Sequence, residues 1–288
     1  MAPLMHSPRF RVLLLAIAAL CASLLLFALP LVHARMLRVP LVAVRATRDF
    51  KQAVEADSHE YFRPPRTQTS GFPNSTATYH RAPCPCLNTL ANHGYLPRDG
   101  KNVTPQMVKQ AIVDVFNIAP SLADTLTSPL KPVFTLSDLS EHNFIEHDAS
   151  LVHNDEYFQT DPSEVNVTMA DDLFARAEKA TEGVITKRVL AHFRAARERD
   201  SEKIDPEYSF SAKLQASAYA EAAAFLLGMG DYDSETISVA DARSFLVDEQ
   251  IPQGWKRSET TITTSVALYV AAKIKFLASF PWFVAAVE

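Results

Sequence analysis

Apolar residues recur at helical spacing along most of the chain after residue 100. In "TPQMVKQAIVDVF", residues 104–116, one face carries Val108, Ala111, Ile112 and Val115. Thr104 suits the N-cap of this helix and Pro105 suits its first position, where a missing N–H costs no hydrogen bond. Helical patterns also cover approximately residues 169–180, 184–199, 212–228, 238–249 and 260–279. The pattern predicts a set of helices joined by loops.

Composition supports an all-α or mostly α fold. Glycine is scarce at 7 residues and proline plentiful at 18, which suits helices between Pro-bounded loops better than hairpins. With 288 residues, 48% of them hydrophobic, the chain can bury one large core, and we expect a single domain over residues 80–288. The net charge of -5 and the scattered lysines and arginines argue against nucleic acid as a partner.

The N-terminus carries a targeting signal. Arg9 and Arg11 precede an uncharged apolar run over residues 12–32, so residues 1–34 are either a cleaved signal peptide or a retained membrane anchor. Three sequons, at Asn74, Asn102 and Asn166, are consistent with glycosylation in the secretory pathway. We therefore expect a secreted protein or, alternatively, a membrane-anchored one, with membrane contact only through an uncleaved N-terminal segment.

Residues 35–79 lack a sustained period and are rich in Pro, Ser and Thr around "YFRPPRTQTSGFPNSTATYH". We expect an extended N-terminal segment that leads into the domain. The alternative is a flexible stalk between an anchor and the domain.

Cys84 stands at the predicted start of a helix in "RAPCPCLNTLANHGYLPRDG", residues 81–100. With Pro85 first in the helix, Cys84 is the N-cap, and the free N–H groups and the helix dipole favour a thiolate. Gly94 suits a left-handed helix end. The sulfur then suits a metal or a nucleophilic role, or it belongs to a buried cysteine in a tight turn. Cys86 lies too close in sequence for a good mutual disulfide.

A zinc site is a further alternative for this stretch. Four donors fall within fourteen positions, although their spacing matches no familiar zinc pattern; they are His80, Cys84, Cys86 and His93.

Two other stretches carry candidate chemistry. In "EHNFIEHDASL", a polar break between helical segments, the side chains of Glu146 and Ser150 with an intervening carbonyl suit a hard cation such as Mg2+; Asp148 as a helix N-cap is the plainer alternative. In "SAYAEAAAFLLGMGD", Glu221 stands among alanines. On a core-facing side its pKa would rise into the range of a general acid-base group, whereas on the other face it would be an exposed helix residue.

Together these stretches resemble the haem-thiolate peroxidase family that contains fungal chloroperoxidase and the unspecific, or aromatic, peroxygenases. The resemblance covers most of the chain after residue 80 and rests on "RAPCPCLNTLANHGYLPRDGKNVT", "EHNFIEHDASL", "AYAEAAAFLLGMGD" and "FLVDEQIPQGWKR". The triplet "EHD" is similar to the shorter branch of the family. The resemblance implies a single multi-helix domain that encloses haem b between the Cys84 helix and a helix bearing the distal glutamate.

The resemblance also implies roles for the site residues. Cys84 is the axial ligand of the haem iron, and a thiolate ligand favours cleavage of the O–O bond. Glu146, Ser150 and the backbone carbonyl of His147 hold Mg2+. Glu221 is the acid-base group that moves the peroxide proton, and His147 orients it.

The resemblance therefore implies an enzyme that uses hydrogen peroxide to transfer oxygen to small organic substrates or to oxidise them. Two alternatives are a haloperoxidase or biosynthetic tailoring oxidase on the same fold, with halide as a further substrate, and a non-catalytic glycosylated interaction domain. Cys86 departs from the family pattern, which more often has a small non-thiol residue there, and we expect it to pack. Ala224 would leave one side of the pocket open if it faces the haem.

Overall fold

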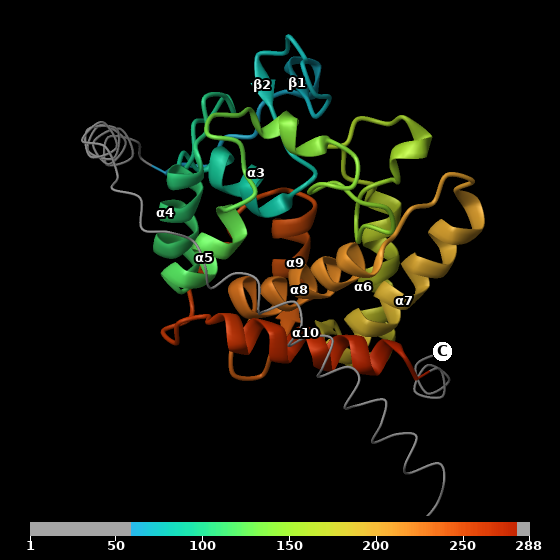
Figure 1. Cartoon of the computed structure of the whole chain (residues 1–288). Helices are drawn as coiled ribbons and strands as arrows, with labels where there is room; N and C mark the ends of the chain where they lie inside the picture. The colour runs from blue at the N-terminus through green and yellow to red at the C-terminus, as the bar shows by residue number, and fades with distance from the viewer. Residues whose placement is uncertain (1–58, 281–288) are drawn as a thin grey trace, which may run out of the picture. The chain divides into compact units, whose positions relative to one another are not determined.

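A computed structural model describes residues 59–280, and α-helices dominate this part of the chain (Figure 1). The eight α-helices are α3 (Pro85–Asn92), α4 (Pro105–Phe116), α5 (Pro120–Thr127), α6 (Val167–Thr181), α7 (Lys187–Ile204), α8 (Ala212–Met229), α9 (Val239–Leu246) and α10 (Thr264–Ala278). Three short 3-10 helices cover Arg66–Gln68, Leu136–Ser140 and Glu156–Phe158. The predicted mostly helical fold is confirmed.

Strands are confined to two short pairs in the described residues. Strand β1 (Thr69–Ser70) runs parallel to β2 (Tyr79–His80), and β3 (Val184–Ile185) runs antiparallel to β4 (Ile237–Ser238). The second pair explains why α7 begins later than its predicted start at residue 184. Residues 184 and 185 pair with β4, and Thr186 then caps the helix by accepting a hydrogen bond from the Val189 N–H.

Side-chain caps fix where most of the long helices begin. Thr104 accepts a hydrogen bond from the Met107 N–H at 3.3 Å, as its N-cap position in the sequence predicts. Ser211 caps α8 in the same way, through the Leu214 N–H. Helix α3 ends at Asn92, and Gly94 follows with a φ of +70°, the left-handed conformation predicted for it.

The core lies where α10 packs along α8 and α7 (Figure 1). Small and branched side chains meet at this contact and are fully buried, among them Ala222 and Leu226 of α8 and Val270 and Ile274 of α10. Helix α6 packs against α7 and α9, α4 against α5, and α3 against α9. This packing places α3, which begins next to Cys84, and α8, which bears Glu221, in one helical body.

Residues 59–79 contain no α-helix and are bonded to the end of α9 and the turn after it. The Tyr61 hydroxyl donates to the Asp248 carbonyl at 2.6 Å, and the Arg63 guanidinium donates to the Val247 carbonyl at 2.8 Å. Arg63 also pairs with Glu249 at 3.4 Å. The alternative of a flexible stalk therefore does not describe residues 59–79.

The predicted signal peptide or anchor at residues 1–34 lies outside the described residues, as does the beginning of the extended segment. Within residues 59–280, no helix is both long and apolar enough to cross a membrane.

Candidate active site

Cys84 occupies the N-cap position of α3, with Pro85 as the first helical residue. Its sulfur makes no capping hydrogen bond, but the N–H groups of Leu87 and Cys86 act on it and lower the pKa of the thiol. Burial acts in the opposite direction and is the larger effect, so the pKa of Cys84 is raised to about 11. The predicted effect of the helix N-terminus is therefore present, but in the protein without a metal desolvation outweighs it.

A buried polar network holds the segment before α3 in place. The Asn88 side chain accepts from the N–H and donates to the carbonyl of Ala82, both at 2.8 Å, and also donates to Glu249 at 2.6 Å. The Arg81 guanidinium donates to the Asn92 side chain at 2.8 and 3.1 Å. Because both asparagines lie one turn apart on α3, these bonds fix the Cys84 backbone relative to the helix.

His147 and Glu221 meet although 74 residues separate them, with 3.3 Å between His147 Nε2 and Glu221 Oε2. The other ring nitrogen, Nδ1, donates to the Asp148 carbonyl at 2.7 Å, which fixes the ring. Burial is the largest single effect and lowers the pKa of His147, but the charge and hydrogen bond of Glu221, together with the bond to the Asp148 carbonyl, outweigh it, so the net pKa lies above the ordinary value of 6.5. A hydrogen bond therefore joins the histidine and the carboxylate that the family resemblance paired.

Glu221 lies on the exposed face of α8, the second of the two alternatives that the sequence left open. Its side chain is 57% exposed, whereas the next two residues of α8, Ala222 and Ala223, are buried. Ala224 is exposed as well, one turn along α8 from Glu221. The negative charge of Glu221 acts on the Cys84 thiol. Glu221 and Ala224 thus share an open face of α8, and Glu221 lies within electrostatic range of the sulfur.

Three further residues near this pair escaped the sequence analysis. Arg194 of α7 is 1% exposed and donates to the Ala149 carbonyl at 2.5 Å, and Arg197 donates to the Ser150 carbonyl at 2.9 Å. His153 is buried, and burial followed by the charge of His147 lowers its pKa to about 4, so this ring stays neutral. Two arginines three residues apart on the apolar face of a predicted helix were the available signal.

The predicted magnesium ligands lie in one loop, but the structure gives Glu146 a partner that the sequence did not suggest. Glu146 Oε2 lies 2.8 Å from His142 Nδ1. Burial raises the pKa of Glu146, and the hydrogen bond from His142 opposes that rise. The oxygen and nitrogen donors of His142, Glu146 and Asp148 converge within 4.8 Å. Magnesium binding by Glu146, Ser150 and the His147 carbonyl stays a prediction.

The zinc alternative is wrong for the described residues. His80 Nδ1 lies 2.6 Å from the Ser137 hydroxyl, and both ring nitrogens of His93 are engaged, one with the His59 carbonyl and one with the Ile251 N–H. Two groups of donors converge closely enough for a metal ion in residues 59–280, and neither includes a cysteine.

The three sequons differ in their surroundings. Asn74 and Asn102 are exposed, both with positive φ angles of 59° and 54°. Asn166 is the N-cap of α6, where its side chain accepts from the Met169 N–H and donates to Asn154 at 2.7 Å. Glycosylation at all three positions stays a prediction, and at Asn166 it would compete with the bond to Asn154.

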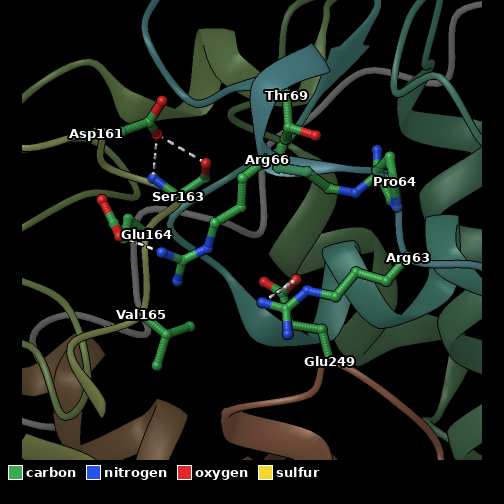
Figure 2. A pocket seen from close by; sticks show the side chains of 10 residues that line it. Arg63, Pro64, Arg66, Thr69, Asp161, Ser163, Glu164, Val165 and Glu249 are labelled. Atoms are coloured by element: carbon green, nitrogen blue, oxygen red, sulfur yellow. Dashed lines mark hydrogen bonds and ion pairs between the residues drawn. The ribbon is translucent and has the colours of Figure 1, made fainter. Parts of the chain in front are cut away.

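A cavity of about 210 Å³ lies beside the Glu249 end of this network (Figure 2). Its charged side chains pair with one another, Arg66 with Glu164 at 2.6 Å and Arg63 with Glu249 at 3.4 Å. None of the predicted site residues lines this cavity. The charged groups of this cavity are therefore paired with one another, and the cavity is separate from the candidate active site.

The residues around Cys84 and Glu221 fit a haem with a thiolate ligand. Cys84 is a free cysteine at a helix N-terminus, where N–H groups stabilise negative charge on sulfur. An exposed carboxylate, oriented by a buried histidine, acts electrostatically on the same sulfur. This donor set matches an axial ligand and an acid-base group for one bound cofactor.

Comparison with known proteins agrees with this chemistry. The family model described as "Peroxidase, family 2" matches residues 59–260. An aromatic peroxygenase of Coprinellus radians is 29% identical over 207 residues, which are 62% of this chain and 78% of the relative.

Two further relatives match over shorter stretches. A chloroperoxidase of Leptoxyphium fumago is 32% identical over 128 residues, 37% of this chain and 34% of the relative. A dothistromin biosynthesis peroxidase of Dothistroma septosporum is 29% identical over 161 residues, 42% of this chain and 39% of the relative. The chain thus matches little more than a third of the length of either of these two.

Proposed function

The chain belongs to peroxidase family 2, the haem-thiolate peroxidases and peroxygenases, and from that premise we propose that it uses hydrogen peroxide to oxygenate or oxidise small organic molecules. The observation that carries the proposal is the contact between His147 and Glu221, whose side-chain nitrogen and oxygen are 3.3 Å apart. Glu221 belongs to α8, and its negative charge acts on the Cys84 thiol. Haem b, once bound, supplies the redox chemistry that cleaves the O–O bond and delivers oxygen to the substrate.

Cys84 is the proposed protein ligand of that haem. Burial keeps its thiol protonated at neutral pH, so ligation of a metal must release one proton. The N–H groups of Leu87 and Cys86 already lower the pKa of the thiol and would stabilise the negative charge left on sulfur. The network of Asn88 and Arg81 holds this position rigid.

Glu221 is the proposed acid-base group. Its exposed carboxylate can take a proton from one oxygen of hydrogen peroxide and return it to the oxygen that leaves as water. His147 Nε2 orients the carboxylate, and the Asp148 carbonyl in turn orients His147. We include Mg2+ at Glu146, Ser150 and the His147 carbonyl in this proposal, as an ion that fixes the same loop.

Replacement of Cys84 tests the proposal most directly. The haem-loaded protein should give the red-shifted Soret band of a thiolate-ligated ferrous carbonyl complex, and Cys84→Ala should abolish it. Cys86→Ala is the matched control, two residues away on the same helix, and should keep the band. A red-shifted band in Cys84→Ala would mean that another residue binds the iron. Product analysis with one aromatic substrate, with and without peroxide, then tests oxygen transfer.

A haloperoxidase or a biosynthetic tailoring oxidase is the second candidate. Similarity to a chloroperoxidase and to a dothistromin biosynthesis peroxidase supports it, and the exposed Ala224 leaves room beside Glu221. Chlorination of a dione and hydroxylation of an aromatic compound, measured side by side, separate the two activities. Purified protein that binds no haem and shows no peroxide-dependent turnover would instead favour an interaction domain.

We also propose that the protein is secreted. The apolar N-terminal run and the exposed sequons at Asn74 and Asn102 support this assignment. N-terminal sequencing of the protein recovered outside the cell, and its shift in mass after glycosidase treatment, test cleavage and glycosylation separately. An intact N-terminus in the membrane fraction would favour the retained anchor.

A further inference from the structure

Three buried carboxylates converge beside the candidate active site. Oxygen atoms of Asp148, Asp155 and Asp205 lie within 4.8 Å of one another, and the three residues are only 1%, 2% and 4% exposed. Asp148 and Asp155 belong to the loop that contains His147, whereas Asp205 follows the last residue of α7. The group therefore joins two segments that are distant in the sequence.

The hydrogen bonds of these carboxylates leave oxygens without a partner. Asp148 Oδ2 accepts from the Ser209 N–H at 2.7 Å, and Asp155 Oδ1 accepts from the Ala149 N–H at 2.9 Å. Asp148 Oδ1 and Asp155 Oδ2 are buried and have no hydrogen-bond partner among the described residues. A buried carboxylate oxygen without a partner is costly, so something else must satisfy these two atoms.

Positive charge near the group is too small to balance it. Arg197 Nη2 lies 3.8 Å from Asp155 Oδ1, beyond hydrogen-bond distance. A ring nitrogen of His142 lies within 4.8 Å of an Asp148 oxygen, but His142 is not one of the residues that converge with Asp155 and Asp205. The local field therefore favours a cation.

The group also borders a cavity of about 260 Å³. Asp148 and Asp205 line it, and the other lining residues are His142, Asn143, Glu156, Tyr157, Glu207 and Ser209. The cavity has room for water molecules, and Glu156 and Glu207 add two more carboxylates at its wall. The cavity therefore lies against two of the three carboxylates.

We propose that Asp148, Asp155 and Asp205 bind a calcium ion, at a site separate from the magnesium site predicted at Glu146 and Ser150. Ca2+ takes six to eight oxygen ligands at about 2.3–2.6 Å in flexible geometry, which three carboxylates and cavity waters can supply. Mg2+ requires a near-ideal octahedron at about 2.0–2.1 Å and dehydrates reluctantly, so it suits such a mixed, roomy site less well.

The ion would fix the position of His147. Asp148 follows His147 directly, and its carbonyl accepts the His147 Nδ1–H. Figure 1 shows the loop before α6 beside the connection from α7 to α8, the two segments that the three carboxylates join. Calcium at this point would hold the His147 loop against the start of the helix that bears Glu221.

Calcium titration of the full-length, haem-loaded protein tests the site. The protein is stripped with a chelator and kept at a fixed, saturating Mg2+ concentration while Ca2+ is added, with calorimetry and thermal unfolding as readouts. Asp205→Asn removes one anionic ligand but keeps an acceptor for the Glu207 N–H that Asp205 binds at 2.7 Å. Asp155→Asn repeats the test while keeping an acceptor for the Ala149 N–H. Asp233→Asn, in an exposed turn, controls for loss of one charge.

Calcium should bind and raise the Tm by roughly 5–10 °C when its concentration is about 100 times Kd. Asp205→Asn and Asp155→Asn should weaken binding at least about tenfold, whereas Asp233→Asn and Glu146→Gln should bind Ca2+ like the wild type. No binding heat and no change in Tm with the wild type would overturn the proposal. So would wild-type binding in Asp205→Asn together with its loss in Glu146→Gln, which would place the ion at the other site. Neither readout depends on turnover.

Discussion

Glu221→Gln keeps the size of the side chain and removes the charge that the proposed proton transfer needs. The residue is 57% exposed on α8, so the change leaves the packed core of the protein intact. We therefore expect haem binding and the Tm to change little. The rate of the peroxide reaction should fall by about 10² to 10⁴, which corresponds to about 2.7–5.4 kcal/mol of transition-state stabilisation.

A second effect of Glu221→Gln distinguishes a lost acid-base group from general damage. The charge and hydrogen bond of Glu221, helped by the bond to the Asp148 carbonyl, raise the pKa of His147 against burial. Without that charge, burial dominates, and the pKa of His147 should fall below its value in the wild type. Nuclear magnetic resonance titration of the His147 ring measures this shift, and stopped-flow absorbance measures the peroxide reaction.

A double-mutant cycle with His147→Gln completes the test. If the two residues act as a unit, the double variant should lose about as much rate as Glu221→Gln alone. Asp233→Asn should behave like the wild type in both assays. An unchanged peroxide reaction in Glu221→Gln would refute the acid-base assignment, and fully additive losses would refute the idea that His147 works through Glu221.

Three other predictions concern stability. The pKa of His147 lies above 6.5 in the folded protein, and the negative charge of Glu221 contributes to that rise. The attraction between the two side chains therefore stabilises the fold fully below pH 6.5 and is lost as the pH rises through the raised pKa. In urea unfolding measured against pH, Glu221→Gln should flatten this part of the stability profile. Gly100→Ala should cost at least about 2 kcal/mol in urea unfolding, because Gly100 has a φ of +69° and an added Cβ would lie 2.1 Å from the His80 carbonyl oxygen. Thr104→Ala should cost about 1 kcal/mol in the same assay, and Thr104→Ser should recover most of it.

The fold was predictable from local patterns because the signals that begin a helix are local. Thr104 and Pro105 mark the start of α4 in the sequence, and the structure begins the helix there. The late start of α7 was not predictable in this way, because Val184 pairs with Ser238, 54 positions further along the chain. Helix α9 also ends at Leu246, before the predicted 249, where the chain turns to form the contacts of Glu249.

The site was less predictable because its chemistry depends on burial and on contacts between distant segments. Alanines around Glu221 fit either face of a helix, so the sequence could not show that this carboxylate is exposed. The partner of Glu146 is His142, four residues earlier, in a loop whose geometry no periodic pattern describes. Only the resemblance to a family brought His147 and Glu221 together in the prediction; the structure supplies the contact.

The surroundings of the two thiols favour Cys84 over Cys86 as the proposed haem ligand. The two thiols lie two residues apart on one helix, and burial raises the pKa of both. Cys84 receives the N–H groups of Leu87 and Cys86, which oppose that rise, whereas the charge of Cys84 adds to it at Cys86. Cys86 also packs against the hydrophobic core, as expected for it. In the proposed haem complex, ionisation of Cys84 would make Cys86 still harder to ionise, so Cys84 would be the thiolate ligand and Cys86 a neutral packing residue.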